Sequence, residues 1–221
     1  MRGLCRLLFL TALYASAARA DDYYAEGSST NLDLGVFDTP LTYADGDHKA
    51  QVGSYCVAFS TPMGSDVSGE LHGGYATLQV DGEPTPSSFQ FSGRYLGLMA
   101  RYQGSGGDHL NLLAELAYTW HDVNGNDFQH QPSEVVWYET WAAVGPVLSY
   151  GPWRFSLGAY LQNLRGNETD QQPARQVDFH SRRGVGGYAG IAFYMDRDNS
   201  IGLYATGGAR QGLQLIFRRE F

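Results

Sequence analysis

His and Asp side chains are the groups in this sequence best suited to acid–base catalysis or metal binding. The densest group is His121-Asp122, followed by Asp127 and His130. A His–Asp pair can act as a base with its orienting carboxylate. The spacing matches no metal motif, however, and such residues in a polar loop are usually solvated. We therefore expect no catalytic residue, no metal and no cofactor.

Missing motifs and the composition exclude several other classes of function. The chain has no Gly-x-Ser-x-Gly elbow, no phosphate-binding glycine loop and no Cys-x-x-Cys. Only 17% of the residues are charged, 14% are aromatic, and the pI is about 5.1. Nucleic-acid binding needs a basic face, and disorder needs high charge with few aromatics. We expect one folded domain with no nucleic-acid partner.

Residues 1–20 have the three parts of a secretory signal peptide. Arg2 and Arg6 form a positive start, an apolar run follows, and Ala18-Arg19-Ala20 is a small-x-small cleavage site. Cleavage after Ala20 would leave a single domain, residues 21–221. It would also remove Cys5 and leave Cys56 as a lone thiol, which we expect to be buried in a strand.

Apolar and polar residues alternate with a period of two in segments of about ten residues, which is typical of β-strands. In most segments the residue phases are clear, for example Leu110 to Trp120 against Asn111 to His121. In the segment 89–102 we assign Phe89, Phe91, Tyr95 and Met99 to one face of the strand, and Gln90, Ser92 and Arg94 to the other face. The ten segments are 31–43, 51–60, 67–80, 89–102, 110–121, 135–150, 153–164, 184–195, 200–206 and 213–221.

The connections between these segments alternate in length. Residues 61–66, 104–108, 151–152 and 196–199 are short turns, whereas 44–50, 81–88, 122–134 and 165–183 are longer loops. Short turns at one end and long loops at the other indicate an up-and-down antiparallel barrel. Tyr and Trp residues near the turns fit a membrane–water boundary.

These features resemble the small outer-membrane β-barrel proteins of Gram-negative bacteria, the OmpA, OmpX and OmpW-like superfamily. The resemblance covers residues 21–221. It implies an all-β transmembrane barrel of about ten strands, with eight as the alternative, in the cell outer membrane. In that superfamily the last strand ends in an aromatic residue that the barrel-assembly machinery reads. Phe217 and Phe221 match that signal, whereas Arg219 departs from it.

The resemblance also implies partners, namely the barrel-assembly machinery, outer-membrane lipid and lipopolysaccharide, for a chain that we expect to be a monomer. Arginines could bind the phosphates of lipopolysaccharide. The candidates lie in the longest loop and are Arg165, Arg175, Arg182 and Arg183. Plain solvated loop surface is an equally good interpretation of these residues.

In a membrane barrel the apolar strand faces meet lipid, so the polar faces must line the lumen. Charged groups there need partners or water. We expect a luminal network in which Arg94 and Arg154 bridge Glu70, Glu115 and Glu139. Such a network fills and rigidifies a barrel of this size more readily than it forms a narrow path.

The expected function is therefore non-enzymatic: structural support, surface interaction or narrow solute passage in the envelope. One alternative is a hydrolase like the outer-membrane lipid A deacylases. In that family His and Ser are separated by one residue, whereas His180 and Ser181 are adjacent here. The other alternative is a soluble, lipocalin-like carrier of a small apolar ligand.

Overall fold

A computed structural model describes residues 27–81, 89–106, 109–126, 132–171, 174–181 and 184–221. They form one antiparallel, 11-stranded sheet. None of the described residues forms a helix long and apolar enough to cross a membrane. The strands are β1 (Ser29–Tyr43), β2 (Gly46–Pro62), β3 (Val67–Asp81), β4 (Phe89–Ser105), β5 (Leu110–Asn126), β6 (Pro132–Tyr150), β7 (Trp153–Gln171), β8 (Ala174–Ser181), β9 (Val185–Tyr194), β10 (Asn199–Gly208) and β11 (Gln211–Glu220).

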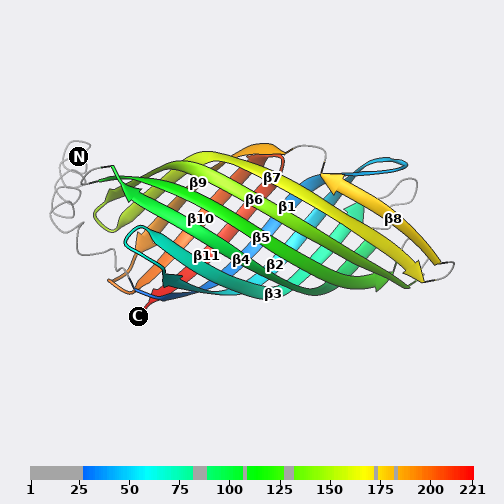
Figure 1. The fold of residues 1–221 in the computed structure, drawn as a ribbon, viewed down its shortest axis with the longest axis horizontal. Helices are drawn as coiled ribbons and strands as arrows, with labels where there is room; N and C mark the ends of the chain where they lie inside the picture. The colour runs from blue at the N-terminus through cyan, green and yellow to red at the C-terminus, as the bar shows by residue number, and fades with distance from the viewer. Residues whose placement is uncertain (1–26, 82–88, 107–108, 127–131, 172–173, 182–183) are drawn as a thin grey trace, which may run out of the picture.

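The sheet closes into a barrel because the last strand pairs with the first. β11 runs antiparallel to β1 from Ser29 opposite Glu220 to Asp38 opposite Gln211. Figure 1 shows that β1 starts and β11 ends at the same end of the barrel, hereafter the end near the chain ends. Closure matters in lipid because every backbone donor and acceptor must find a partner within the protein. The predicted up-and-down barrel is confirmed.

The number of strands in the ring changes along the barrel. β7 pairs with β9 over Trp153–Leu161 and with β8 over Arg165–Gln171. β8 then meets β1 at Leu41 and Thr42. The ring near the chain ends therefore consists of β1–β7 and β9–β11, ten strands, and the far ring of β1–β8, eight strands. The ring near the chain ends has the predicted ten strands, whereas β8, the eleventh strand of the sheet, was not predicted.

The segment 165–183 was predicted to be a loop, and this prediction is wrong. It contains the last seven residues of β7 and all of β8. The hairpin forms because β8 alternates too: Phe179 is buried, whereas Asp178 and His180 on either side are exposed. With one apolar face, β8 can cover the lumen above the short strands β9–β11, each of ten residues.

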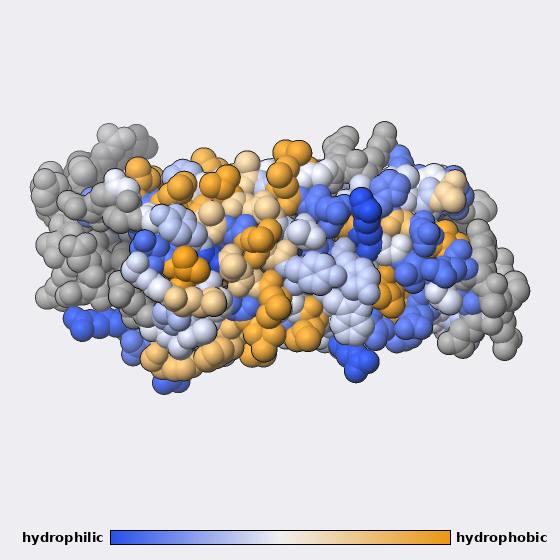
Figure 2. All heavy atoms as spheres, in the orientation of Figure 1, coloured by the Kyte–Doolittle hydropathy of each residue, from blue (hydrophilic) through white to orange (hydrophobic). Residues whose placement is uncertain are grey.

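The outer wall carries an apolar belt over the half of the barrel near the chain ends. Its large side chains are well exposed, for example Leu98 at 62%, Leu157 at 63% and Leu116 at 58%. Figure 2 shows this concentration of hydrophobic residues on one half and a mostly hydrophilic surface on the half toward β8. A soluble protein would bury such residues, so the alternative of a soluble, lipocalin-like carrier is wrong.

β4 has the opposite phase to the one predicted. Phe91 and Tyr95 are buried inside the barrel, whereas Leu96 and Leu98 are exposed on the outer wall. Arg94 therefore points outward with its side chain 77% exposed, paired with Asp122 at 3.5 Å. The prediction failed because the strand has apolar residues on both faces: lipid covers one face, and the interior of the far half covers the other.

Candidate functional site

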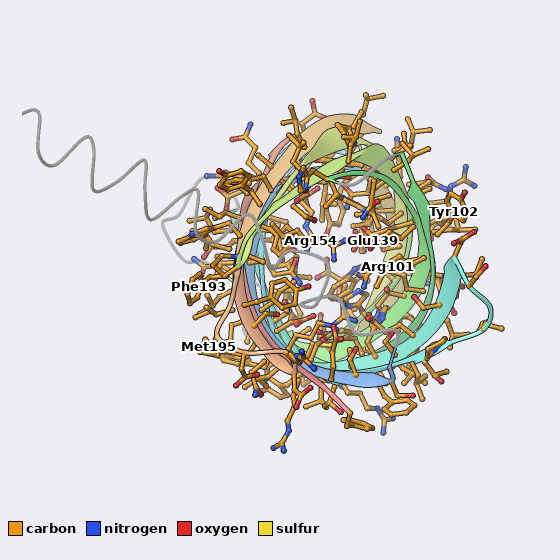
Figure 3. The ribbon with its side chains drawn as sticks, turned by 90° about the vertical axis from the view of Figure 1, so that its left-hand side faces the viewer. Arg101, Tyr102, Glu139, Arg154, Phe193 and Met195 are labelled. Atoms are coloured by element: carbon orange, nitrogen blue, oxygen red, sulfur yellow. The ribbon has the colours of Figure 1, made fainter. Side chains whose placement is uncertain are left out.

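Charged side chains fill the interior of the barrel near the chain ends, around a cavity of about 290 Å³. Four of the five predicted network residues line it: Glu70, Glu115, Glu139 and Arg154. Viewed from that end in Figure 3, Arg101, Arg154 and Glu139 point into the lumen, whereas Tyr102 and Phe193 point outward. Arg94, the fifth, is on the outer wall, so its place in the network is a wrong prediction.

Arg101 takes the role that Arg94 was expected to play. It lies directly opposite Glu115 on the neighbouring strand, with Nε 2.8 Å from a carboxylate oxygen. Both side chains are largely shielded from water. Arg101 was not predicted from the sequence, because the predicted phase of β4 was wrong. An arginine within the apolar belt has to face inward, and that constraint could have identified it.

Glu139 is bound from two other elements. Arg210 Nη1 and Gln162 Nε2 each donate to Glu139 Oε1 at 2.9 Å. Arg210 lies in the turn between β10 and β11, and its guanidinium also sits 3.3 Å from the ring centre of Phe37. This turn is held inside the barrel, because the Tyr160 hydroxyl accepts a hydrogen bond from the Arg210 backbone N–H at 2.9 Å. The turn therefore lies inside the lumen, where it is bonded to β6 through Glu139 and to β7 through Tyr160.

Glu70 lies in a second cluster on β1 and β3. Asn31 Nδ2 donates to it at 3.3 Å, and His72 Nδ1 lies 3.6 Å from its other oxygen. The other ring nitrogen of His72 contacts the Thr119 hydroxyl at 3.1 Å. Gly97 makes room for this contact, since a Cβ there would lie 2.2 Å from His72 Nε2.

Arg154 and Arg218 complete the charged interior. Arg154 donates to Gln103 Oε1 at 2.7 Å, and Arg218 Nε lies 3.0 Å from Glu220. The predicted bridging of carboxylates by Arg154 is thus wrong: among the described residues its guanidinium bonds to the Gln103 amide oxygen and to Tyr194. Arg101, Arg210 and Arg218 each have a carboxylate oxygen within 3.0 Å, which reduces the cost of burying these charges.

The other half of the lumen is apolar and densely packed. Its buried side chains come from all eight strands of that ring. Several are almost completely inaccessible: Leu41, Leu78, Phe91, Val123, Val135, Trp137, Leu164 and Phe179. We call these eight residues the apolar seal. Water and ions avoid a passage filled by such side chains. The seal therefore closes the charged cavity toward β8.

His121 marks the boundary between the two halves. Its ring stacks on Trp137 at 4.2 Å and on Tyr95 at 5.1 Å. Asp122, its neighbour in sequence, points to the opposite face and pairs with Arg94. The two cannot act as a base and its orienting carboxylate. Asp127 and His130 lie outside the described residues, within which no group of three or more His, Cys, Asp or Glu could hold a metal ion.

His180 and Ser181 also point to opposite faces of their strand. His180 is exposed on the outer wall, whereas the Ser181 hydroxyl accepts a hydrogen bond from the Leu164 backbone N–H at 3.3 Å. Adjacent residues of a strand diverge in this way. The pair therefore lacks the contact that a serine nucleophile needs with its base.

The remaining candidates fall in different places. Arg165 is exposed on the outer wall of β7, and Arg175 lies on β8 opposite Asp170. Arg182, Arg183 and the signal peptide, residues 1–20, are outside the described residues. Phe217 and Phe221 point outward from the end of the last strand, and Phe221 lies 6.2 Å from the ring of Phe59. Their role as an assembly signal stays a prediction.

Cys56 is buried in β2 at 5% exposure, which confirms the prediction made for it.

Comparison with known proteins identifies the fold. No protein-family model and no curated protein matches the sequence. Among solved structures, the chain is similar to the translocator domain of the autotransporter NalP from Neisseria meningitidis. The TM-score is 0.51 at 8% identity, over 100% of this chain and 97% of that one. The transport unit of the autotransporter AIDA-I from Escherichia coli follows, with a TM-score of 0.49 at 11% identity, over 95% and 97%.

A third similar structure is the outer membrane protease OmpT from Escherichia coli, with a TM-score of 0.46 at 6% identity, over 88% of this chain and 95% of that one. The similarity to the NalP translocator domain shows that the fold is that of Gram-negative outer-membrane β-barrels. Together with the apolar belt, it places this chain in the outer membrane, as the sequence predicted.

Proposed function

We propose that this protein is a closed outer-membrane barrel, which supports the envelope and presents an interaction surface instead of conducting solutes. The observation that carries the proposal is the apolar seal. A pore needs a continuous polar path, and here the charged cavity ends against eight packed apolar side chains. An ion would lose its hydration in the seal without gaining polar partners, which costs several kcal/mol or more.

Single-channel recording of the mature protein in planar bilayers tests the proposal. We expect no conductance steps at moderate voltage, with insertion of the folded barrel checked by its heat-modifiable mobility on a gel. Steady conductance from the wild-type protein would contradict a closed barrel.

Narrow, gated solute passage is the second candidate, and the charged cavity of about 290 Å³ favours it. It requires the seal to move. Rare, brief openings in the same recordings would support this candidate, because a static packed seal would give none.

The proposal assigns no enzymatic activity to the chain. Mass spectrometry of lipid A from a deletion strain tests this part. Lipid A identical to that of the parent strain is expected, and a lost or retained acyl chain would overturn it.

A further inference from the structure

We propose that a groove on the outer wall of β6, β7 and β8 binds the phosphorylated sugar headgroup of an outer-leaflet glycolipid. The groove has a volume of about 610 Å³. It lies where β7 exchanges β9 for β8 as its neighbour. The side chains that face it come from all three strands and are Tyr138, Asn163, Arg165, Asn167, Asp178 and His180.

The position of the groove fits a lipid headgroup. Leu161, two residues before Asn163 on the same face of β7, is 60% exposed and belongs to the apolar belt. On β6, Val144 is the third outward-facing residue after Tyr138, and it is 50% exposed. The groove therefore begins where the belt ends. Acyl chains can lie against Leu161 and Val144 while the polar headgroup enters the groove above them.

The charges of the groove fit a phosphate and a sugar. Arg165 is exposed and lines the groove, where its guanidinium can form a charge-assisted bond to a phosphate. Asn163 and Asn167 flank it along β7 and can bond to sugar hydroxyls. Asp178 is opposite Asn167, one row further from the belt, where it would accept bonds from sugar hydroxyls or an amine.

The aromatic ring of Tyr138 supplies a flat wall. Tyr138 is directly opposite Arg165 across the β6–β7 ladder and is 44% exposed. Tyr118 on β5 stacks against it, with ring centres 6.0 Å apart. A sugar ring can pack on such a face, as Tyr commonly does where an apolar and an aqueous region meet.

Native mass spectrometry of the mature barrel in detergent micelles tests the proposal, with bisphosphorylated lipid A as the probe. We expect lipid A to bind the wild-type barrel and Arg165→Ala to weaken binding about tenfold, the loss of a charge-assisted bond. Arg94→Ala is the matched control, since Arg94 is also an exposed outward arginine but lies outside the groove. The affinity of the Arg94→Ala variant for lipid A should stay within about twofold of wild type.

Two further probes separate the possible sources of the phosphate. Dephosphorylated lipid A should bind the wild-type barrel as weakly as lipid A binds the Arg165→Ala variant. Glucosamine 1-phosphate, which has no acyl chains, should bind much more weakly than lipid A. The proposal is overturned if Arg165→Ala binds like wild type, if Arg94→Ala loses as much, or if glucosamine 1-phosphate binds as tightly as lipid A. Asn163→Leu provides a second groove variant and should also reduce lipid A binding.

Discussion

Individual charges in the lumen depend on one or two close partners. Arg101 and Glu115 face each other across a single ladder, whereas Arg210 reaches Glu139 from a turn that enters the lumen. Isolated charges in such an interior would be costly. We therefore expect these pairs to matter more for stability than the outward pair of Arg94 and Asp122, which water screens.

The pair of Arg101 and Glu115 gives the sharpest test. Glu115→Ala should destabilise the folded barrel by about 3 kcal/mol, because it leaves a buried guanidinium without its nearest carboxylate. The double variant Arg101→Met with Glu115→Leu should lie within about 1 kcal/mol of wild type. Reversible urea unfolding in lipid vesicles measures both, and Arg94→Ala serves as the exposed control. Equal losses from the single and double variants would contradict this account.

At this scale the sequence predicts which residues face inward on most strands, β4 being an exception, but it does not predict which residues they contact. Lipid imposes a strict alternation, so Glu70, Glu115, Glu139 and Arg154 could be placed in the lumen from the sequence. Their partners depend on the ring register and on which turn enters the barrel. Arg210 lies in a short turn of the kind usually found at the surface, and nothing in the local sequence indicates that the Tyr160 hydroxyl holds it inside.

Among the strands, β8 has the shortest pairing with one of its neighbours, β1. It pairs with β7 over seven positions but with β1 over two, Leu41 opposite Ser181 and Thr42 opposite His180. The predicted strand phases depended on long runs, and β8 has eight residues. Its alternation of Val177 and Phe179 with polar residues was a usable signal. The acidic and basic residues around it favoured a loop instead.

A disulfide tests the pairing of β8 with β1. In a Cys56→Ser background, Thr42→Cys with His180→Cys should oxidise readily, because directly opposite residues of an antiparallel ladder lie within disulfide reach. Thr42→Cys with Arg165→Cys is the control, since β8 lies between those two positions. The shift on a non-reducing gel reports the bond. Equal oxidation of both pairs would mean that β8 does not sit between β7 and β1.

The carboxylate of Asp196 stabilises the turn between β9 and β10. Asp196 accepts hydrogen bonds from the backbone N–H groups of Asp198 at 2.9 Å and Asn199 at 2.8 Å, and from the Asn199 side chain. The Asn199 amide is the main cause that lowers the pKa of Asp196 below its ordinary 3.8. Because the folded pKa is lower, the stabilising effect is present above 3.8 and disappears as the pH falls through the folded pKa.

Asp196→Ala should therefore unfold at a lower temperature than wild type at neutral pH. The difference should shrink as the pH falls below 3.8, since protonation removes the same interaction from the wild-type protein. Heat-modifiable mobility measured from about pH 7 to about pH 2 gives both midpoints. A difference that stays constant over this range would show that the carboxylate charge does not hold the turn.

For the whole molecule, the division of the lumen into a charged half and an apolar half predicts how conductance can be created. Phe91→Ala with Trp137→Ala removes two large side chains of the seal, 1% and 2% exposed. We expect conductance steps in planar bilayers from this variant, because water can enter the space and join the charged cavity. Leu98→Ala on the lipid side is the control and should remain silent. A silent double variant would place the barrier elsewhere.

The unequal strand lengths have a consequence for what meets the cell from outside. β6 and β7 have 19 residues each, against ten in β9, β10 and β11. The excess corresponds to roughly 30 Å along a strand. The tall hairpins and β8 stand clear of the bilayer on one side of the molecule, and the packed seal stiffens them from within. We therefore expect a molecule that docks on this end of the barrel to meet a stiff surface that is tall along β6–β8 and low along β9–β11.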